Sequence, residues 1–224
     1  MVKEIEIKMP TSYADISLKK WLVLQNELKS YEDDEEATVA ILLSHLCNLP
    51  FEYHKGLSVD DYIMIKTELN KFLSIHDLPL QKFITIDGVE YGFEPNLSEM
   101  SYGAYLDITK FKNINIDENW SKIMSILYRP VTNKSGTHYS IKTYNGSEDK
   151  TVFDNVGMDV HFGALFFLYN LLMDLLKDIL KSSMEMDLAP TIKQILARSG
   201  QHILQSLNSP MEILPNSTPL LKSH

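Results

Sequence analysis

The sequence is poor in the residues that build recognisable chemical sites. It has one cysteine, Cys47, in 224 residues, which excludes a disulfide within the chain and fits a reducing cytoplasm. Its nine glycines form neither G-x-G-x-x-G nor G-x-x-x-x-G-K-[ST], the patterns that let backbone N–H groups approach a phosphate. The G-x-S-x-G elbow of a nucleophilic serine is also missing. An enzyme hypothesis therefore has no positive support, and we expect no catalytic residue and no cofactor.

Metal-binding patterns are equally scarce. None of the seven histidines forms H-x-x-x-H or H-x-H, and no second cysteine exists to complete a zinc site. The carboxylate run in residues 31–36, YEDDEE, could suggest a divalent metal, but neighbours in a run do not converge on one point. A solvated loop or a helix N-terminus is the better interpretation, and we expect no metal site. Cys47 and His45 are interpreted as core residues, and Glu94 and Glu99 as surface carboxylates.

Charge and hydropathy argue against two further classes of partner. The net charge is −9, and residues 1–112 hold 11 Lys/Arg against 19 Asp/Glu. Such a surface has little affinity for a phosphate backbone, so we expect no nucleic-acid partner. The most apolar run, 162–180, is interrupted or ended by Asn170, Asp174, Lys177, Asp178 and Lys181, which fall three or four apart on one helical stripe. This spacing predicts a helix in a core or interface rather than in a membrane. Because MVKEIEIKMP has no apolar stretch, we also expect no signal peptide.

Local patterns predict a helix-rich chain with few strands. Asp87-Gly88 separates two alternating runs and favours a type I′ turn, hence a β-hairpin over about 82–94. Ser58 and Asp61 form a capping-box-like arrangement before an apolar-periodic segment. Residues 131–150 are either an exposed loop or a second hairpin around Ser135-Gly136. Helices are predicted from about Ile16 and over 35–49, 58–73, 101–111, 117–129 and 158–183, and Pro130 is expected to stop the helix over 117–129. A weaker helix is predicted over 189–207 and a short strand over 3–9.

These elements amount to an α+β, helix-dominated single domain with one or two small antiparallel β-hairpins and an extended C-terminal arm. The helix-rich domain spans 1–183, and residues 184–224 hold a short helix and a proline-containing arm.

Aromatic residues concentrate in the middle of the chain. Phe93 and Trp120 are interpreted as core. Tyr102 and Tyr105, with Arg129 of the LYRP motif, are candidate interface residues, because aromatic rings near an arginine commonly anchor protein interfaces. The arm could lie on a neighbouring subunit through its own apolar residues. Those candidates are Met211, Ile213, Leu214, Leu220 and Leu221.

The order of several motifs gives the chain a family resemblance. An opening I-x-I-x-x-P is followed by LPFEYHKGLSVDDYIMI, the Asp-Gly hairpin, PNLSEMSYGAYLD, LYRP, Y-N-G and VHFGALFFLYNL. This order, over about residues 3–182, resembles small proteins encoded in the structural gene blocks of tailed bacteriophages, including crAss-like phages and other phages of Bacteroides-type hosts. LPFEYHKGLSVDDYIMI also resembles the helical part of phage tail assembly chaperones.

The resemblance implies a non-enzymatic role in the virion or its assembly. One version is a tail, neck or internal virion component that stays in the particle as a homo-oligomer contacting portal, neck or tail subunits. A second is a tail assembly chaperone that binds tail subunits, is made in the host cytoplasm and is absent from the mature particle. A third hypothesis, from a different class, is a phage adaptor that binds a host protein. Under any of them PNLSEMSYGAYLD is expected to be scaffold or interface.

Overall fold

The computed structural model describes residues 7–31, 34–74, 78–111 and 115–185. It is helix-rich with a single four-stranded antiparallel sheet made of two hairpins, which confirms the α+β fold class. The described residues form two compact units. The helical unit comprises residues 7–12, 23–31, 34–74 and 173–185, and the sheet unit comprises 13–22, 78–111 and 115–172. The division falls inside two helices, and no shift in composition marks it in the sequence.

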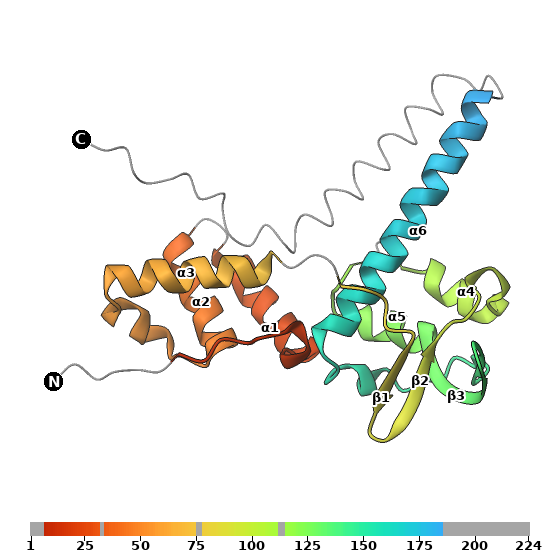
Figure 1. Cartoon of the computed structure of the whole chain (residues 1–224), viewed down its shortest axis with the longest axis horizontal. Coiled ribbons are helices and arrows are strands. Elements are labelled where there is room, and N and C mark those ends of the chain that lie inside the picture. The colour runs from red at the N-terminus through yellow and green to blue at the C-terminus, as the bar shows by residue number, and fades with distance from the viewer. Residues whose placement is uncertain (1–6, 32–33, 75–77, 112–114, 186–224) are drawn as a thin grey trace. The chain divides into compact units, whose positions relative to one another are not determined.

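The helical unit contains α2, Glu35–Cys47, and α3, Val59–Leu73, together with the second half of α1, Leu18–Leu28 (Figure 1). Their starts follow the predicted local chemistry. Asp34 accepts a hydrogen bond from the Ala37 backbone N–H, so the acidic run provides a helix cap, as expected. Ser58 caps α3 by accepting from the Asp61 N–H and donates to the Asp61 carboxylate.

The interior of the helical unit is aliphatic. Nearly the whole of α2 is buried, which agrees with a sequence that is apolar on almost every side and lacks the polar face of an amphipathic helix. α3 buries one side only, and several large apolar side chains on its other side remain exposed. The buried apolar residues of this unit include Leu24, Leu28, Val39, Ile41, Leu42, Leu43, Leu46, Ile65, Leu69 and Phe72.

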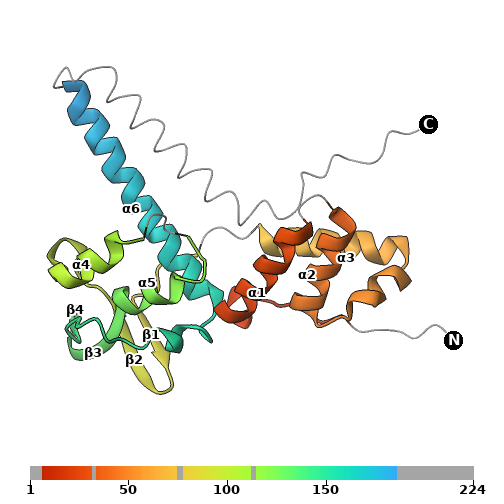
Figure 2. The ribbon, with the colours of Figure 1, turned by 180° about the vertical axis from the view of Figure 1, so that it is seen from behind.

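The sheet unit is built on two successive hairpins (Figure 2). Strands β1, Phe83–Ile86, and β2, Val89–Phe93, meet at Asp87 and Gly88, whose φ angles of 50° and 78° are those of the predicted type I′ turn. The second hairpin is present too, with β3, Tyr128–Ser135, antiparallel to β4, His138–Ile141. The strand order is β1-β2-β3-β4, because β2 also pairs with β3.

One predicted boundary is wrong. The helix expected over 117–129 begins at Trp120 and ends at Leu127 as α5, and the chain continues directly into β3. Tyr128 pairs with Phe93 and Pro130 with Tyr91, so Pro130 lies within a strand instead of stopping a helix. Strand pairing with β2 takes the place of the last helical turn that the sequence predicts. Nothing in the residues of the LYRP motif indicates this change from helix to strand.

The core of the sheet unit joins the start of α1 to the start of α6, Met158–Glu185. Backbone hydrogen bonds run from Leu18 N to Val156 O and from Met158 N to Ile16 O. Three rings pack edge to face beside them, with Phe162 at 5.0 Å from Tyr13 and 5.3 Å from Trp21 between ring centroids. Phe93 and Trp120 are 3% and 0% exposed, which confirms their interpretation as core.

α6 carries the polar stripe predicted for the most apolar run. Each of its five members, Asn170, Asp174, Lys177, Asp178 and Lys181, is exposed. Within the described residues one stretch, Met158–Leu175, is long and apolar enough to cross a membrane, and 39% of it is buried in the protein. Its first turns, with Phe162, Ala164 and Leu165, are core of the sheet unit.

Three predicted segments lie wholly or mostly outside the described residues. They are the strand over 3–9, of which only the irregular residues from Ile7 onward are described, the weaker helix over 189–207 and the C-terminal arm.

Candidate interaction surface

The sheet unit displays an aromatic face on a short helix. α4, Tyr102–Thr109, begins at Ser101, whose hydroxyl accepts from the Ala104 N–H at 3.3 Å. Ala104 is fully buried, whereas Tyr102, Tyr105 and Leu106 are 75%, 56% and 40% exposed. These three residues fall at i, i+3 and i+4, so they share one side of the helix. We call them the α4 tyrosine face.

The opposite side of α4 is fixed to the rest of the unit through Asp107. Its carboxylate accepts hydrogen bonds from the Tyr144 hydroxyl and from Lys110 Nζ, each at 2.5 Å. The bonds from Lys110 and Tyr144 lower the pKa of Asp107, because they favour its ionised form. Burial, and then the Asp107 carboxylate, raise the pKa of Tyr144, so its hydroxyl stays a donor at neutral pH. These contacts hold α4 with its tyrosine face toward solvent.

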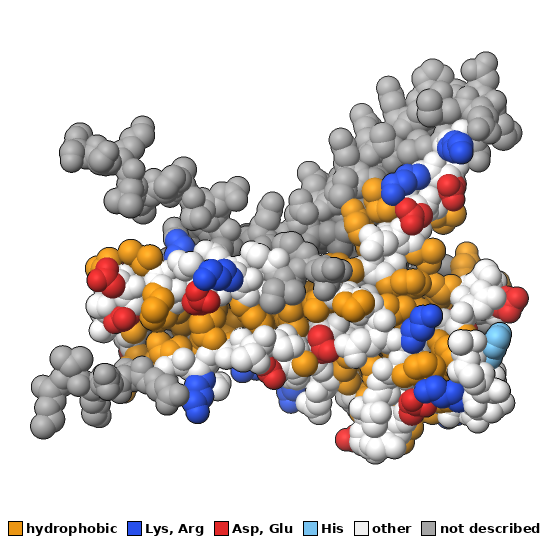
Figure 3. Space-filling model, viewed as in Figure 1, with side chains coloured by type: hydrophobic (Ala, Val, Ile, Leu, Met, Phe, Trp, Pro, Cys, Tyr) orange, Lys and Arg blue, Asp and Glu red, His pale blue; other side chains and the backbone are white. Residues whose placement is uncertain are grey.

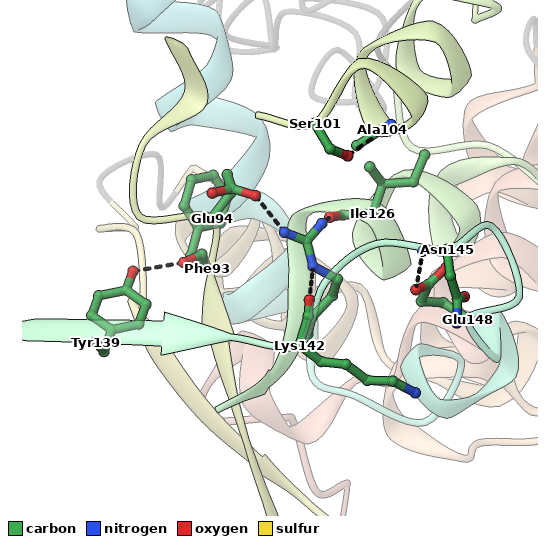
Figure 4. Close-up of polar contacts among 10 residues, drawn as sticks. Phe93, Glu94, Ser101, Ala104, Ile126, Tyr139, Lys142, Asn145 and Glu148 are labelled. Atoms are coloured by element: carbon green, nitrogen blue, oxygen red, sulfur yellow. Dashed lines mark hydrogen bonds and ion pairs between the residues drawn. The ribbon is translucent and has the colours of Figure 1, made fainter. Parts of the chain in front are cut away.

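Arg129 is an internal anchor, and its prediction as an interface residue is corrected. Its side chain is 6% exposed and donates to three acceptors within the sheet unit (Figure 4). Nη2 bonds to Glu94 Oε2 at 2.5 Å, Nη1 to the Ile126 carbonyl at 2.6 Å and Nε to the Lys142 carbonyl at 2.7 Å. With its guanidinium committed to these acceptors, Arg129 has no surface to offer a partner.

The Glu94–Arg129 pair sets where the chain leaves the sheet toward α4. The Glu94 carboxylate is 9% exposed, so it is not the surface carboxylate expected from the sequence. The backbone N–H of Glu94 donates to the Leu127 carbonyl at 2.7 Å. The Tyr139 hydroxyl donates to the Phe93 carbonyl at 2.6 Å (Figure 4). The exit of β2 is thus held on both sides, and the next residues lead into α4.

Tyr144 connects these two sets of contacts. The Arg129 guanidinium carbon lies 5.9 Å from the centroid of the Tyr144 ring, a cation–π distance, while the hydroxyl of the same ring bonds to Asp107. A continuous path of contacts therefore runs from Glu94 through Arg129 and Tyr144 to α4. The face that α4 presents is built on a fixed support.

The structure places the predicted interface residues in three situations. Tyr102 and Tyr105 lie together on α4 and are exposed, as an interface requires. Arg129 supports them from the interior. Met211, Ile213, Leu214, Leu220 and Leu221 lie outside the described residues.

Sequence reasoning missed three residues of this arrangement. Glu94, Asp107 and Tyr144 come from the end of β2, from α4 and from the stretch after β4. Their partners are 35 to 37 positions away in the sequence, and no short motif joins them. The only available signal was the opposite charge of Glu94 and Arg129 at the ends of two predicted elements.

The titratable residues of the described segments do not gather into a metal site. No group of three or more His, Cys, Asp or Glu able to hold a metal ion occurs in the described part of the chain. His45, only partly buried, bonds to Glu27 at 2.6 Å, so it is satisfied by a surface partner instead of lying in the core as expected. Cys47 is buried, as predicted.

Comparisons with known proteins provide no relative for this chain. No family model matches it, and neither a curated protein nor a solved structure does so.

Proposed function

We propose that the chain is a non-enzymatic bacteriophage protein that works through protein–protein contacts as a virion component or in virion assembly, with the α4 tyrosine face as one binding surface. The observation that carries the binding role is the exposure of Tyr102 and Tyr105 on a helix whose other side is fixed. Tyrosines are favoured at interfaces because each buries a large ring while keeping a hydroxyl for hydrogen bonding.

The contacts that hold α4 in place behind the α4 tyrosine face favour recognition of a folded partner surface. A preorganised face loses little conformational freedom on binding, so more of the contact energy goes into affinity. Within the described residues the hydroxyls of Tyr102 and Tyr105 have no hydrogen-bond partner, so both are available to acceptors on another protein. The viral context comes from the motif order that includes PNLSEMSYGAYLD, and α4 begins within that motif.

The first experiment is quantitative mass spectrometry of purified, intact phage particles, calibrated against portal and capsid protein. We expect the chain in a fixed ratio to the portal protein, consistent with a symmetric homo-oligomer in the tail, neck or interior. Abundance in infected cells with absence from particles would contradict residence in the virion and favour the tail assembly chaperone.

The second experiment tests the face itself. Wild-type chain and the Tyr102→Ala/Tyr105→Ala variant would be compared as baits in infected cells, with Val89→Ala on the β1–β2 hairpin as the matched control for loss of exposed apolar surface. We expect portal, neck or tail subunits with wild type and control, and their loss with the tyrosine variant. Capture of a host protein alone would contradict the assembly role and favour the adaptor.

A further inference from the structure

A second apolar surface lies on the helical unit and is independent of the α4 tyrosine face. On α3, Val59, Ile63 and Met64 are 74%, 56% and 59% exposed. They fall within two turns of the helix, on the side away from its buried residues, such as Ile65 and Leu69. We call them the α3 apolar face. Figure 3 shows hydrophobic and acidic side chains next to each other on the surface over α3.

The surroundings of the α3 apolar face are acidic. Asp60 and Asp61 follow Val59 in the first turn of the helix and are exposed. Across the described part of the helical unit, residues 23–31 and 34–74 carry eight Asp/Glu against four Lys/Arg, an excess of four negative charges. An occupant of the face should therefore combine an apolar stripe with positive charge.

A segment that follows α6 in the sequence has that combination. Residues 188–211 include Lys193 and Arg198 and no Asp or Glu, in a protein whose net charge is −9. Within it, apolar residues recur at helical spacing, which predicts an amphipathic helix whose two basic residues flank the apolar stripe. The stripe consists of Leu188, Ile192, Ile195, Leu196, Ile203 and Leu207.

We propose that residues 188–207 dock on the α3 apolar face of the same chain. The stripe would cover Val59, Ile63 and Met64, and Lys193 and Arg198 would lie near the acidic first turn of α3. A helix that lays its apolar side on an apolar surface is a common mode of recognition. The segment begins three residues after α6 ends at Glu185, so it is tethered to the unit that it binds, which raises its effective concentration there.

A cross-linking experiment on the full chain tests the placement. The variant Met64→Cys/Ile195→Cys would be oxidised in dilute solution, beside Val89→Cys/Ile195→Cys as control, because Val89 is an exposed apolar residue on the β1–β2 hairpin. We expect an intramolecular disulfide to form at least about tenfold faster in the first variant, because docking raises the effective concentration of the two thiols. Equal rates in the two variants would overturn the proposal. A disulfide-linked dimer would overturn its intramolecular form and assign the face to a second copy.

Hydrogen exchange of the full chain gives a test without new cysteines. We expect amides of 190–207 to exchange about tenfold or more faster in Ile63→Asp than in wild type, because a charge in the face opposes docking. Val89→Asp should leave them unchanged. Unaltered protection of 37–46, the buried α2, would show that the helical unit stays folded. Equal exchange of 190–207 in wild type and Ile63→Asp would overturn the proposal. Binding of residues 188–207 to anionic phospholipid vesicles that is equal in wild type and Ile63→Asp would also overturn the proposal. Such a result would assign Lys193 and Arg198 to a lipid surface.

Discussion

The indole N–H of Trp120 donates to Nδ1 of His161 over 3.1 Å, in a fully buried part of the sheet unit. Because an indole nitrogen can only donate, Nδ1 must accept, and the imidazole proton resides on Nε2. Nε2 then donates to the Phe153 carbonyl at 3.2 Å. His161 thus links α5, α6 and the short 3-10 helix Lys150–Phe153 in a single tautomer, and in its neutral form.

This arrangement predicts a pH-dependent stability. Burial is the main cause that lowers the pKa of His161 to about 4 from its usual 6.5. Below pH 6.5 the unfolded chain therefore binds a proton that the folded protein excludes, and the free energy of unfolding falls until the pH approaches 4. Between pH 7.5 and pH 5 the expected loss from this group is about 2 kcal/mol.

Urea unfolding at the two pH values would measure this loss, with His161→Gln as the comparison because its side chain does not titrate. The variant should be less stable at pH 7.5 but should lose less stability on acidification. Identical losses in wild type and variant would rule out His161 as the source.

The Glu94–Arg129 pair should be far more important for stability than a surface pair on the same strands. Replacing Glu94 with Ala leaves a buried guanidinium without its counter-charge, and we expect a loss of about 3–5 kcal/mol. Glu90 pairs with Lys134 between β2 and β3 at 2.8 Å, but both side chains are more than 40% exposed. Glu90→Ala should cost about 1 kcal/mol or less.

Chemical denaturation of both variants makes this comparison. Adding Arg129→Met to Glu94→Ala should cost less than the sum of the two single changes, because the pair is lost only once. Equal effects of Glu94→Ala and Glu90→Ala would contradict a buried role for the pair.

Gly92 is predicted to be a packing requirement of the sheet. A Cβ at this position would lie 2.9 Å from both the Tyr139 ring and Ile141 of β4, closer than atoms can pack. Gly92→Ala should therefore destabilise the protein by about 1–3 kcal/mol through overpacking.

Gly56 is the matched control, because nothing lies within 4 Å of its added Cβ and its φ is not in the left-handed region. Gly56→Ala should be neutral or stabilising by about 0.4–1 kcal/mol, since alanine restricts the unfolded chain. Thermal unfolding of both variants tests the contrast, and a stable Gly92→Ala protein would argue against the close approach of Tyr139.

The two sides of α4 should separate binding from stability. Tyr102→Ala/Tyr105→Ala removes exposed rings, so the free energy of unfolding should change by only about 0.5 kcal/mol per substitution. Its loss of binding should exceed about 2 kcal/mol if these rings are hot spots. Ala104→Leu, on the buried side, should instead destabilise by about 1–3 kcal/mol. Calorimetric unfolding and partner titration on the same samples would show whether the effects divide in this way.

The sequence by itself determined the elements whose causes are local. Caps at Asp34 and Ser58 act within three residues, and the Asp87-Gly88 turn depends only on two φ angles that this pair adopts readily. The polar stripe of α6 follows from helical geometry alone. The sequence predicts the exposure of Tyr102 and Tyr105 less directly, from residue type alone.

Tertiary structure alone decided the features that depend on partners distant in the chain. Tyr128 lies in a strand and not in the predicted helix because it pairs with Phe93. Arg129 is buried because the Glu94 carboxylate and two backbone carbonyls accept hydrogen bonds from its guanidinium. The division into two units also arises from long-range packing, since it cuts through α1 and α6. Such choices depend on which groups meet when the core forms, and a local pattern of residues does not contain that information.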